Sequence, residues 1–269
     1  MRPTRITRLF ESLKQQGRPG LIAYLTAGDP SPDHTPALVA ALERGGADLI
    51  ELGVPFSDPI ADGPVIQRGS DRALRAGTTL RKVLDIATKI REHSEIPLLL
   101  FTYLNPVLRF GLEDLARAAA DHGIDGCLLT DVSVEEAETY VDAMRRHDLD
   151  TVFLAAPTST VERRKLVAKY STGFIYLVSR TGVTGERESL SNAAPVLVDD
   201  MRHVTDLPLA LGFGISTAQH VQAAGRIADA VVVGSAIVRT IEDHASSPEL
   251  EQRLERFASE LASGLPSKS

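Results

Sequence analysis

The sequence has little of what marks secreted, membrane or nucleic-acid-binding proteins. Its single cysteine, Cys127, excludes an internal disulfide and gives no sign of an oxidising compartment, so we expect a cytoplasmic location. The nearest approach to a membrane span, LLLFTYL, is far shorter than the roughly 18 apolar residues that a span needs. A formal charge of -7 argues against binding to nucleic acid or to an acidic membrane, although a local site can still hold a small anion.

One pattern recurs along the chain: a short apolar run, a turn, and an amphipathic stretch with helical spacing. Most runs are apolar at nearly consecutive positions, which is typical of strands buried on both faces of a parallel sheet. The runs are LIAYLTA (21–27), DLIELGV (48–54), PLLLFTY (97–103), GCLLTDV (126–132), TVFLAA (151–156), FIYLVS (174–179), PLALGFG (208–214) and ADAVVVG (228–234).

Eight such units in about 250 residues match the number and size of a (β/α)8 TIM barrel, an α/β fold. The competing fold, a doubly wound open sheet, usually has fewer strands and a glycine-rich turn after the first one, whereas AGDPSPD follows here. We therefore expect residues 1–269 to form a single (β/α)8 barrel domain. An extra N-terminal helix that packs on it is predicted by the helical spacing of Ile6, Leu9, Phe10 and Leu13.

Lysine, histidine and cysteine are missing from the positions where they would carry chemistry in such a barrel. The six lysines lie in helical stretches or in the tail, which argues against a Schiff-base enzyme. Of the seven histidines only His34 falls in a loop after a predicted strand, so no metal site is predicted. Cys127 falls at the start of a strand, where we expect a buried, inert thiol. We expect neither a metal nor a cofactor in this chain.

One stretch, ELGVPFSDPIADGPVIQ (51–67), brings three carboxylates to the end of a strand, where active sites of barrels collect. Glu51 lies among apolar residues, and burial should raise its pKa toward the range useful for proton transfer. Asp62 lies on the loop, and two carboxylates in unlike surroundings can divide acid and base roles. However, Asp58 and Asp62 also suit turns beside prolines, and Glu51 could bridge inside the barrel, so the catalytic interpretation stays open.

Glycines gather at the ends of the last two predicted strands, in LGFGIS and VGSAIV. They allow backbone N–H groups to approach an anion closely, and Ser235 at a helix start can add a hydroxyl. Loops at this place in the fold often bind phosphate, which we predict here, with plain tight turns as the alternative. Residues 179–189 have the composition of a lid that would exclude water, or of an ordinary solvated loop.

Five segments resemble the tryptophan synthase alpha subunit family, in the same order and with spacing that fits a barrel. They are LIAYLTAGDP, ELGVPFSDPIADGPVIQ, FIYLVSRTGVTG, LGFGIS and VVVGSAIV, and the similarity runs over residues 21–238. The resemblance implies a barrel-shaped lyase that cleaves indole-3-glycerol phosphate to indole and glyceraldehyde 3-phosphate in L-tryptophan biosynthesis. Carboxylates can supply the proton transfers and stabilise a cationic indole intermediate without metal or imine.

The resemblance also implies roles for individual residues. Glu51 matches the family's general acid/base, which protonates indole C3 and deprotonates the glycerol hydroxyl. Asp62 matches the carboxylate that binds the indole N–H and stabilises positive charge there. Tyr176 matches an active-site tyrosine near Glu51, and Phe213 matches an aromatic residue that contacts indole. Thr184 matches a lid threonine that hydrogen-bonds the strand-two aspartate. The matched phosphate-binding positions are Gly185, Gly212, Gly214, Gly234 and Ser235.

A partner is implied as well, the pyridoxal-phosphate-dependent tryptophan synthase beta subunit, in an α2β2 heterotetramer that channels indole. One departure from the family lies after Asp131, where proline commonly stands two residues on and this chain has Ser133. That position affects the details of docking and leaves catalysis intact. The loops that resemble the docking face carry Pro55, Phe56, Pro59, Asn105 and Pro106.

Two other functions stay open at this point. A free-standing indole-glycerol-phosphate lyase would release indole as a metabolite, and the sequence does not separate it from a partner-dependent subunit. A non-catalytic allosteric partner of the beta subunit is the other, and the intact pair Glu51 and Asp62 argues against it, since a pure effector could lose both residues.

Overall fold

Parallel strands form the centre of the structure, a computed structural model that describes residues 2–178, 193–212 and 214–267. Neighbouring strands pair in the order β5-β4-β3-β2-β1-β9-β8-β7-β6. The eight predicted runs all contain a strand. The strands are β1 (Gly20–Thr26), β2 (Leu49–Gly53), β3 (Leu98–Thr102), β4 (Gly126–Leu129), β5 (Asp150–Thr151), β6 (Leu154–Ala155), β7 (Ile175–Val178), β8 (Leu209–Gly212) and β9 (Ala230–Val233).

The sheet closes into a barrel because the two ends of this order belong to one run of the chain. Only Val152 and Phe153 separate β5 from β6, so the fifth predicted strand is split in two. The N–H of Val152 donates to the carbonyl of Cys127 on β4 (3.1 Å), while the carbonyl of Phe153 accepts from the N–H of Tyr176 on β7 (3.1 Å). The predicted (β/α)8 barrel is confirmed.

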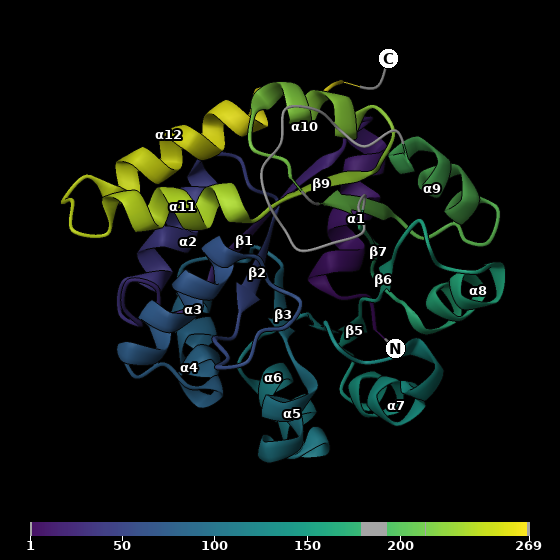
Figure 1. Ribbon diagram of the computed structural model, residues 1–269, viewed down its shortest axis with the longest axis horizontal. Helices are drawn as coiled ribbons and strands as arrows, with labels where there is room; N and C mark the ends of the chain where they lie inside the picture. Colours follow the sequence, from purple (N-terminus) through teal and green to yellow (C-terminus); the bar gives the residue numbers. More distant parts are fainter. Residues whose placement is uncertain (1, 179–192, 213, 268–269) are drawn as a thin grey trace.

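Helices surround the strands (Figure 1). Strand side chains alternate between them and the barrel interior: Ile50 and Leu52 pack outward, whereas Leu49 packs inward. The helices are α1 (Arg5–Gln16), α2 (Thr35–Arg44), α3 (Pro64–Arg75), α4 (Leu80–Arg91), α5 (Leu104–Phe110), α6 (Leu112–Asp121), α7 (Glu138–Arg146), α8 (Val161–Tyr170), α9 (Ala193–Arg202), α10 (Ala218–Gly225), α11 (Ser235–His244) and α12 (Leu250–Ala262), with a 3-10 turn at Val134–Glu136.

One part of the sequence interpretation was wrong in detail. Asn105 and Pro106 do not lie in a loop, because they form the first turn of α5. Proline is tolerated there, since the first N–H groups of a helix have no partner within it.

Helix α1 closes one end of the barrel. Ile6, Phe10 and Leu13 are buried in the same cluster as inward-facing strand residues, and the ring of Phe10 lies 5.6 Å from that of Phe174. Arg5 pairs with Asp125, which directly precedes β4, at 3.1 Å. The predicted N-terminal helix is confirmed, and it packs against the end where the strands begin. A binding site inside the barrel must therefore open at the other end.

No helix in the described ranges combines the length and the apolar character needed to cross a membrane.

Candidate active site

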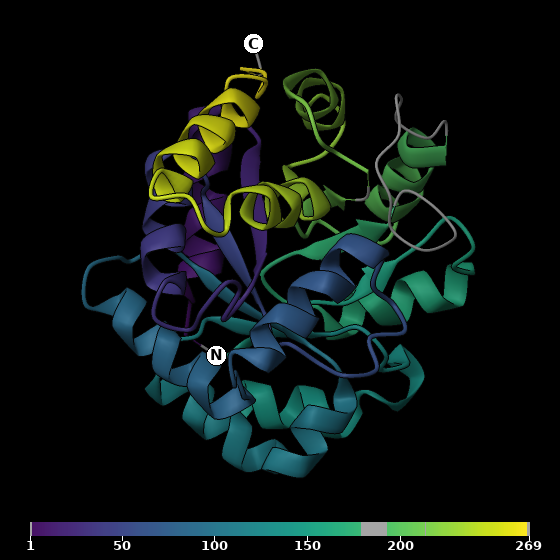
Figure 2. The ribbon, with the colours of Figure 1, turned by 60° about the vertical axis from the view of Figure 1, so that its left-hand side comes forward.

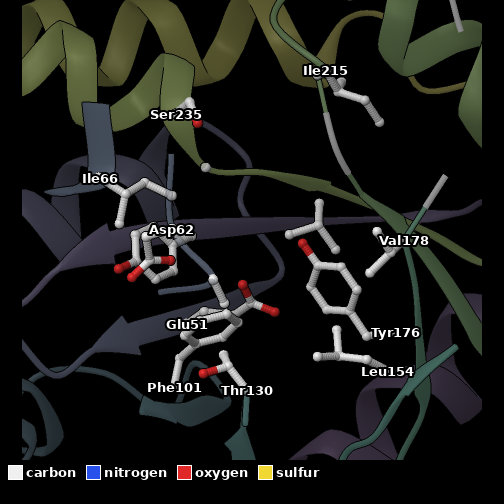
Figure 3. Close-up of a pocket in the computed structure, with 15 residues that line it drawn as sticks. Glu51, Asp62, Ile66, Phe101, Thr130, Leu154, Tyr176, Val178, Ile215 and Ser235 are labelled. Atoms are coloured by element: carbon white, nitrogen blue, oxygen red, sulfur yellow. The ribbon is translucent and has the colours of Figure 1, made fainter. Parts of the chain in front are cut away.

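A pocket of about 740 Å³, measured out to its open mouth, lies at the end of the barrel where the strands stop (Figure 3). Residues from most of the strand ends and following loops line it. Of the predicted site residues, those in the lining are Glu51, Asp62, Tyr176, Gly214, Gly234 and Ser235.

Glu51 is a buried carboxyl group that faces the pocket from β2. Its side chain is 1% exposed, and its Oε1 has no hydrogen-bond partner among the described residues. Burial raises the pKa of Glu51 to about 8, so the group is protonated at neutral pH, and the predicted rise is confirmed. Figure 3 shows its carboxyl group between Asp62 and Tyr176. A buried acid without a partner in a pocket can exchange a proton with whatever binds there.

Asp62 lies on the loop after β2, two residues before the start of α3. It is 7% exposed, and its Oδ2 accepts a hydrogen bond of 2.9 Å from the hydroxyl of Tyr103. Burial raises the pKa of Asp62 to about 6, and the hydrogen bond from Tyr103 opposes that rise. At neutral pH Asp62 is therefore mostly an anion, whereas Glu51 is mostly a neutral acid. The two carboxyls have the different charges that a division of roles requires.

Two glycines make room for tyrosine hydroxyls near Glu51. A Cβ atom on Gly212 of β8 would lie 2.4 Å from the hydroxyl of Tyr176, and a Cβ on Gly53 of β2 would lie 2.3 Å from the hydroxyl of Tyr24. Real atoms do not come this close, so a side chain at either position would displace the tyrosine. Gly212, predicted to bind phosphate, thus contacts Tyr176 and is not among the described residues that line the pocket.

The start of helix α11 also lines the pocket, away from Glu51 (Figure 3). Ser235 is its first residue, as predicted, and Gly234 precedes it without any side-chain cap from the described residues. The first turn contains no acidic residue, so its free N–H groups and the positive end of the helix dipole can attract an anion. Gly214 has φ +78°, a left-handed backbone that favours glycine. The pocket thus has carboxyl groups at one end and an anion-binding helix terminus at the other.

Three predicted site residues lie outside the described residues: Thr184, Gly185 and Phe213. The proposed lid at 179–189 also lies there. The structure tests none of these assignments.

Several pocket residues were not assigned from the sequence. Tyr24 of β1 meets Phe101 of β3 edge to face, with ring centroids 5.2 Å apart. Tyr24 is the register partner of Glu51, so the alternation of inward and outward positions could have indicated it. These apolar walls suit a flat aromatic ring. The remaining lining residues are Ala61, Ile66, Thr130, Leu154, Val178, Ile215 and Val232.

Metal and thiol chemistry find no support in the described residues. None of their His, Cys, Asp and Glu side chains form a group of three or more that could hold a metal ion. Cys127 is buried, and burial raises the pKa of its thiol to about 12, so it is not a nucleophile at neutral pH.

Comparisons with known proteins agree over nearly the whole chain. A family model described as tryptophan synthase alpha chain matches residues 10–265. A tryptophan synthase alpha chain from Solibacter usitatus (strain Ellin6076) is 68% identical over 266 residues, covering 99% of this chain and 100% of that protein. Another from Geotalea uraniireducens (strain Rf4) is 46% identical over 262 residues, covering 97% and 98%. A chain from a structure of Mycobacterium tuberculosis tryptophan synthase superposes with a TM-score of 0.90 at 37% identity, covering 98% of each chain.

Proposed function

The chain belongs to the tryptophan synthase alpha chain family, and on that premise we propose that Glu51 and Asp62 carry the family's reaction here. That reaction is the retro-aldol cleavage of indole-3-glycerol phosphate into indole and glyceraldehyde 3-phosphate, in L-tryptophan biosynthesis. The chain is accordingly a carbon–carbon lyase. The observation that carries the residue assignment is that two buried carboxyls with unlike surroundings lie in one pocket. Glu51 has no hydrogen-bond partner at Oε1 among the described residues, whereas Asp62 accepts a hydrogen bond from Tyr103.

The charge states give the order of proton transfers. Glu51 starts neutral and delivers its proton to indole C3, which places positive charge on the ring. Asp62, as an anion, accepts the indole N–H and stabilises that charge. The Glu51 carboxylate then takes the proton of the glycerol hydroxyl as the bond from C3 to the side chain breaks and a carbonyl forms. Indole leaves, and Glu51 has regained its proton, so the cycle balances.

The phosphate group of the substrate would bind at the start of α11. Support comes from the free N–H groups after Gly234, the hydroxyl of Ser235 and the left-handed turn at Gly214, all beside the pocket. Tyr24, Phe101 and the aliphatic lining would hold the indole ring at the end where the carboxyls lie. Thr184, Gly185 and Phe213 stay in the proposal as residues that the resemblance assigns.

A beta subunit that carries pyridoxal phosphate is the proposed partner, in an α2β2 heterotetramer in the cytoplasm, with no cofactor in the alpha chain itself. Two large apolar side chains support a docking surface near the pocket mouth. Ile60, on the loop after β2, is 78% exposed, and Leu108, on the helix after β3, is 61% exposed. They follow neighbouring strands, so both lie toward the same end of the barrel.

The test is to incubate the purified full chain with indole-3-glycerol phosphate and measure indole and glyceraldehyde 3-phosphate, with and without a beta subunit. We expect both products in equal amounts and a higher rate in the complex. Equal rates would favour the free-standing lyase. No product under either condition would contradict the catalytic proposal and favour the non-catalytic partner.

A further inference from the structure

The hydroxyl group of Tyr103 lies between the backbone and the side chain of the loop that carries Asp62. Tyr103 follows β3, is 3% exposed, and is not among the described residues that line the pocket. Its Oη accepts a hydrogen bond from the N–H of Ala61 at 3.1 Å and donates one to Oδ2 of Asp62 at 2.9 Å. Tyr103 therefore binds the loop that carries Asp62 on the side away from the pocket, and it does not line the space for substrate.

The direction of these two hydrogen bonds is fixed by chemistry. A backbone N–H can only donate, so Oη accepts from Ala61 and directs its own proton at the Asp62 carboxylate. A hydrogen bond donated to a carboxylate favours the ionised state. Within the described residues, Oδ1 of Asp62 accepts no hydrogen bond, which leaves this oxygen for a donor bound in the pocket.

The ring of Tyr103 is itself held in place. It packs against Phe56, with ring centroids 5.2 Å apart and the planes inclined at 34°. Phe56 belongs to the same stretch after β2 as Asp62, so the tyrosine contacts this stretch through its ring and through its hydroxyl. Burial and this ring contact hold the hydroxyl oxygen in place beside the carboxylate.

We propose that Tyr103 is a positioning residue for the lyase reaction: its hydroxyl orients the Asp62 carboxylate toward the indole N–H and keeps it ionised. The inference rests on the proposed function, in which Asp62 stabilises a cation and must be an anion. Burial already raises the pKa of Asp62 to about 6, and loss of this hydrogen bond raises the pKa further. A larger share of Asp62 is then protonated at a given pH.

The test is Tyr103→Phe in the full chain, which removes one oxygen atom and keeps the ring against Phe56. We measure kcat and KM for indole release between pH 5 and pH 9. We expect the acid limb of the profile to move up by about one pH unit, since hydrogen bonds to charged groups are the strong ones. The loss of kcat should approach tenfold below the limb and be smallest at pH 8.5, where Asp62 is ionised and only its orientation is affected. KM should change less than kcat.

Tyr140→Phe is the matched control. Tyr140 is 4% exposed and also donates a buried hydrogen bond, at 2.6 Å to the carbonyl of Cys127, but it lies outside the pocket. Both variants lose one buried hydroxyl, so both should lower the unfolding temperature by similar amounts. Only Tyr103→Phe should shift the acid limb. An unshifted limb in Tyr103→Phe, or an equal shift in the control, would overturn the proposal.

A measurement without turnover separates this inference from the proposed function. Titration of carbon-13-labelled aspartate by NMR, with Asp62→Asn to assign the signal, gives the pKa of Asp62 directly. We expect a higher pKa in Tyr103→Phe than in the unsubstituted chain, and an equal pKa would overturn the inference even if the enzyme is active. If the unsubstituted chain releases no indole, the proposed function fails while the titration still decides the role of Tyr103.

Discussion

Glu51 and Asp62 differ in charge at neutral pH because their surroundings differ in more than the degree of burial. Glu51 has no hydrogen-bond donor at Oε1 among the described residues, so desolvation alone acts on it. Asp62 is nearly as buried, but Tyr103 donates to it. Stronger desolvation of Glu51 and the hydrogen bond from Tyr103 to Asp62 together keep the pKa of Glu51 above that of Asp62.

The rate should therefore depend on pH with a bell-shaped profile. In the free enzyme kcat/KM should rise through about pH 6, as Asp62 ionises, and fall through about pH 8, as Glu51 loses its proton. The profile is measured by indole release, with a return to pH 7 after each incubation to show that the protein stays folded. An alkaline side that stays flat to pH 9.5 would show that the proton of Glu51 is not needed.

The free energy of unfolding should also depend on pH through the protonation of Glu51. Burial raises its pKa from the ordinary 4.5 to about 8. The contribution of Glu51 to the free energy of unfolding is therefore fully present below pH 4.5 and is lost as the pH rises toward 8. Glu51→Gln does not titrate, so its advantage over the unsubstituted chain should grow across this window by up to about 1.4 kcal/mol per pH unit. Urea unfolding at pH 4.5, 6 and 8 measures this difference. A constant difference would mean that Glu51 is ionised in the folded protein.

The residues of the site were predictable from sequence only in part. Glu51 could be identified because a charged residue is unusual in the middle of an apolar strand sequence. Tyr103 was not assigned, because its role depends on the register between β3 and β2 and on which loop lies opposite it. That register is set by the packing of the whole barrel and is not written in local periodicity.

At the scale of elements, α3 shows why the strands were easier to predict than some helices. The helix starts at Pro64, where proline is favourable, but it contains Gly69, which weakens a helical pattern. The structure gives a reason for the glycine: a Cβ there would lie 2.9 Å from a methyl of Val238 on α11, so glycine lets the two helices approach (Figure 2). The benefit lies in a distant contact, which a local pattern cannot indicate.

An ion-pair network joins the same two helices. Arg72 of α3 makes two hydrogen bonds of 2.8 Å to the buried Asp29 after β1, and also pairs with Glu242 of α11 at 2.7 Å. Asp62 lies two residues before α3, and Ser235 is the first residue of α11. The carboxylate and the anion-binding terminus are thus placed by two helices that are tied together.

The start of α11 yields a prediction about substrate binding. Gly234→Asp adds a negative charge beside the proposed phosphate position, and the repulsion should weaken substrate binding by about tenfold or more. Calorimetry with the slow Glu51→Gln background measures the affinity without turnover. Gly234→Ala is the steric comparison, since its Cβ would meet Tyr24 at an ordinary 3.5 Å, and it should weaken binding far less. Equal effects of the two substitutions would argue against a phosphate at this position.

At the scale of the whole molecule, one end of the barrel is covered by a helix and the other end contains the pocket. Helix α1 packs against the end where the strands begin, with Phe10 against Phe174 and Arg5 paired to Asp125. The pocket and the exposed apolar side chains lie at the end where the strands stop. The repeat of apolar runs and helical stretches predicted this barrel, because period and length suffice for it. The split of the fifth strand at Val152 and Phe153 was not predictable, since it reflects a change of pairing partner within one run.

The exposed end gives a prediction about assembly. Leu108→Asp on α5 should weaken association with a beta subunit by about tenfold or more, because it places a charge within an apolar contact. Val196→Asp on α9 is the matched control, since both side chains are 61% exposed. Association is measured by sedimentation or by the rise in lyase rate on titration with the beta subunit. Equal affinities of the two variants would place the docking surface elsewhere.

The role of Glu51 in proton transfer is tested most directly by measuring both turnover and substrate binding of Glu51→Gln. Glutamine keeps the size of the side chain but cannot exchange a proton, so indole release should fall by about a thousandfold or more. Affinity for indole-3-glycerol phosphate, measured by calorimetry on the same sample, should stay within a few fold of the unsubstituted chain. Turnover close to normal in Glu51→Gln would contradict the assignment of this buried carboxyl as the proton donor and acceptor of the reaction.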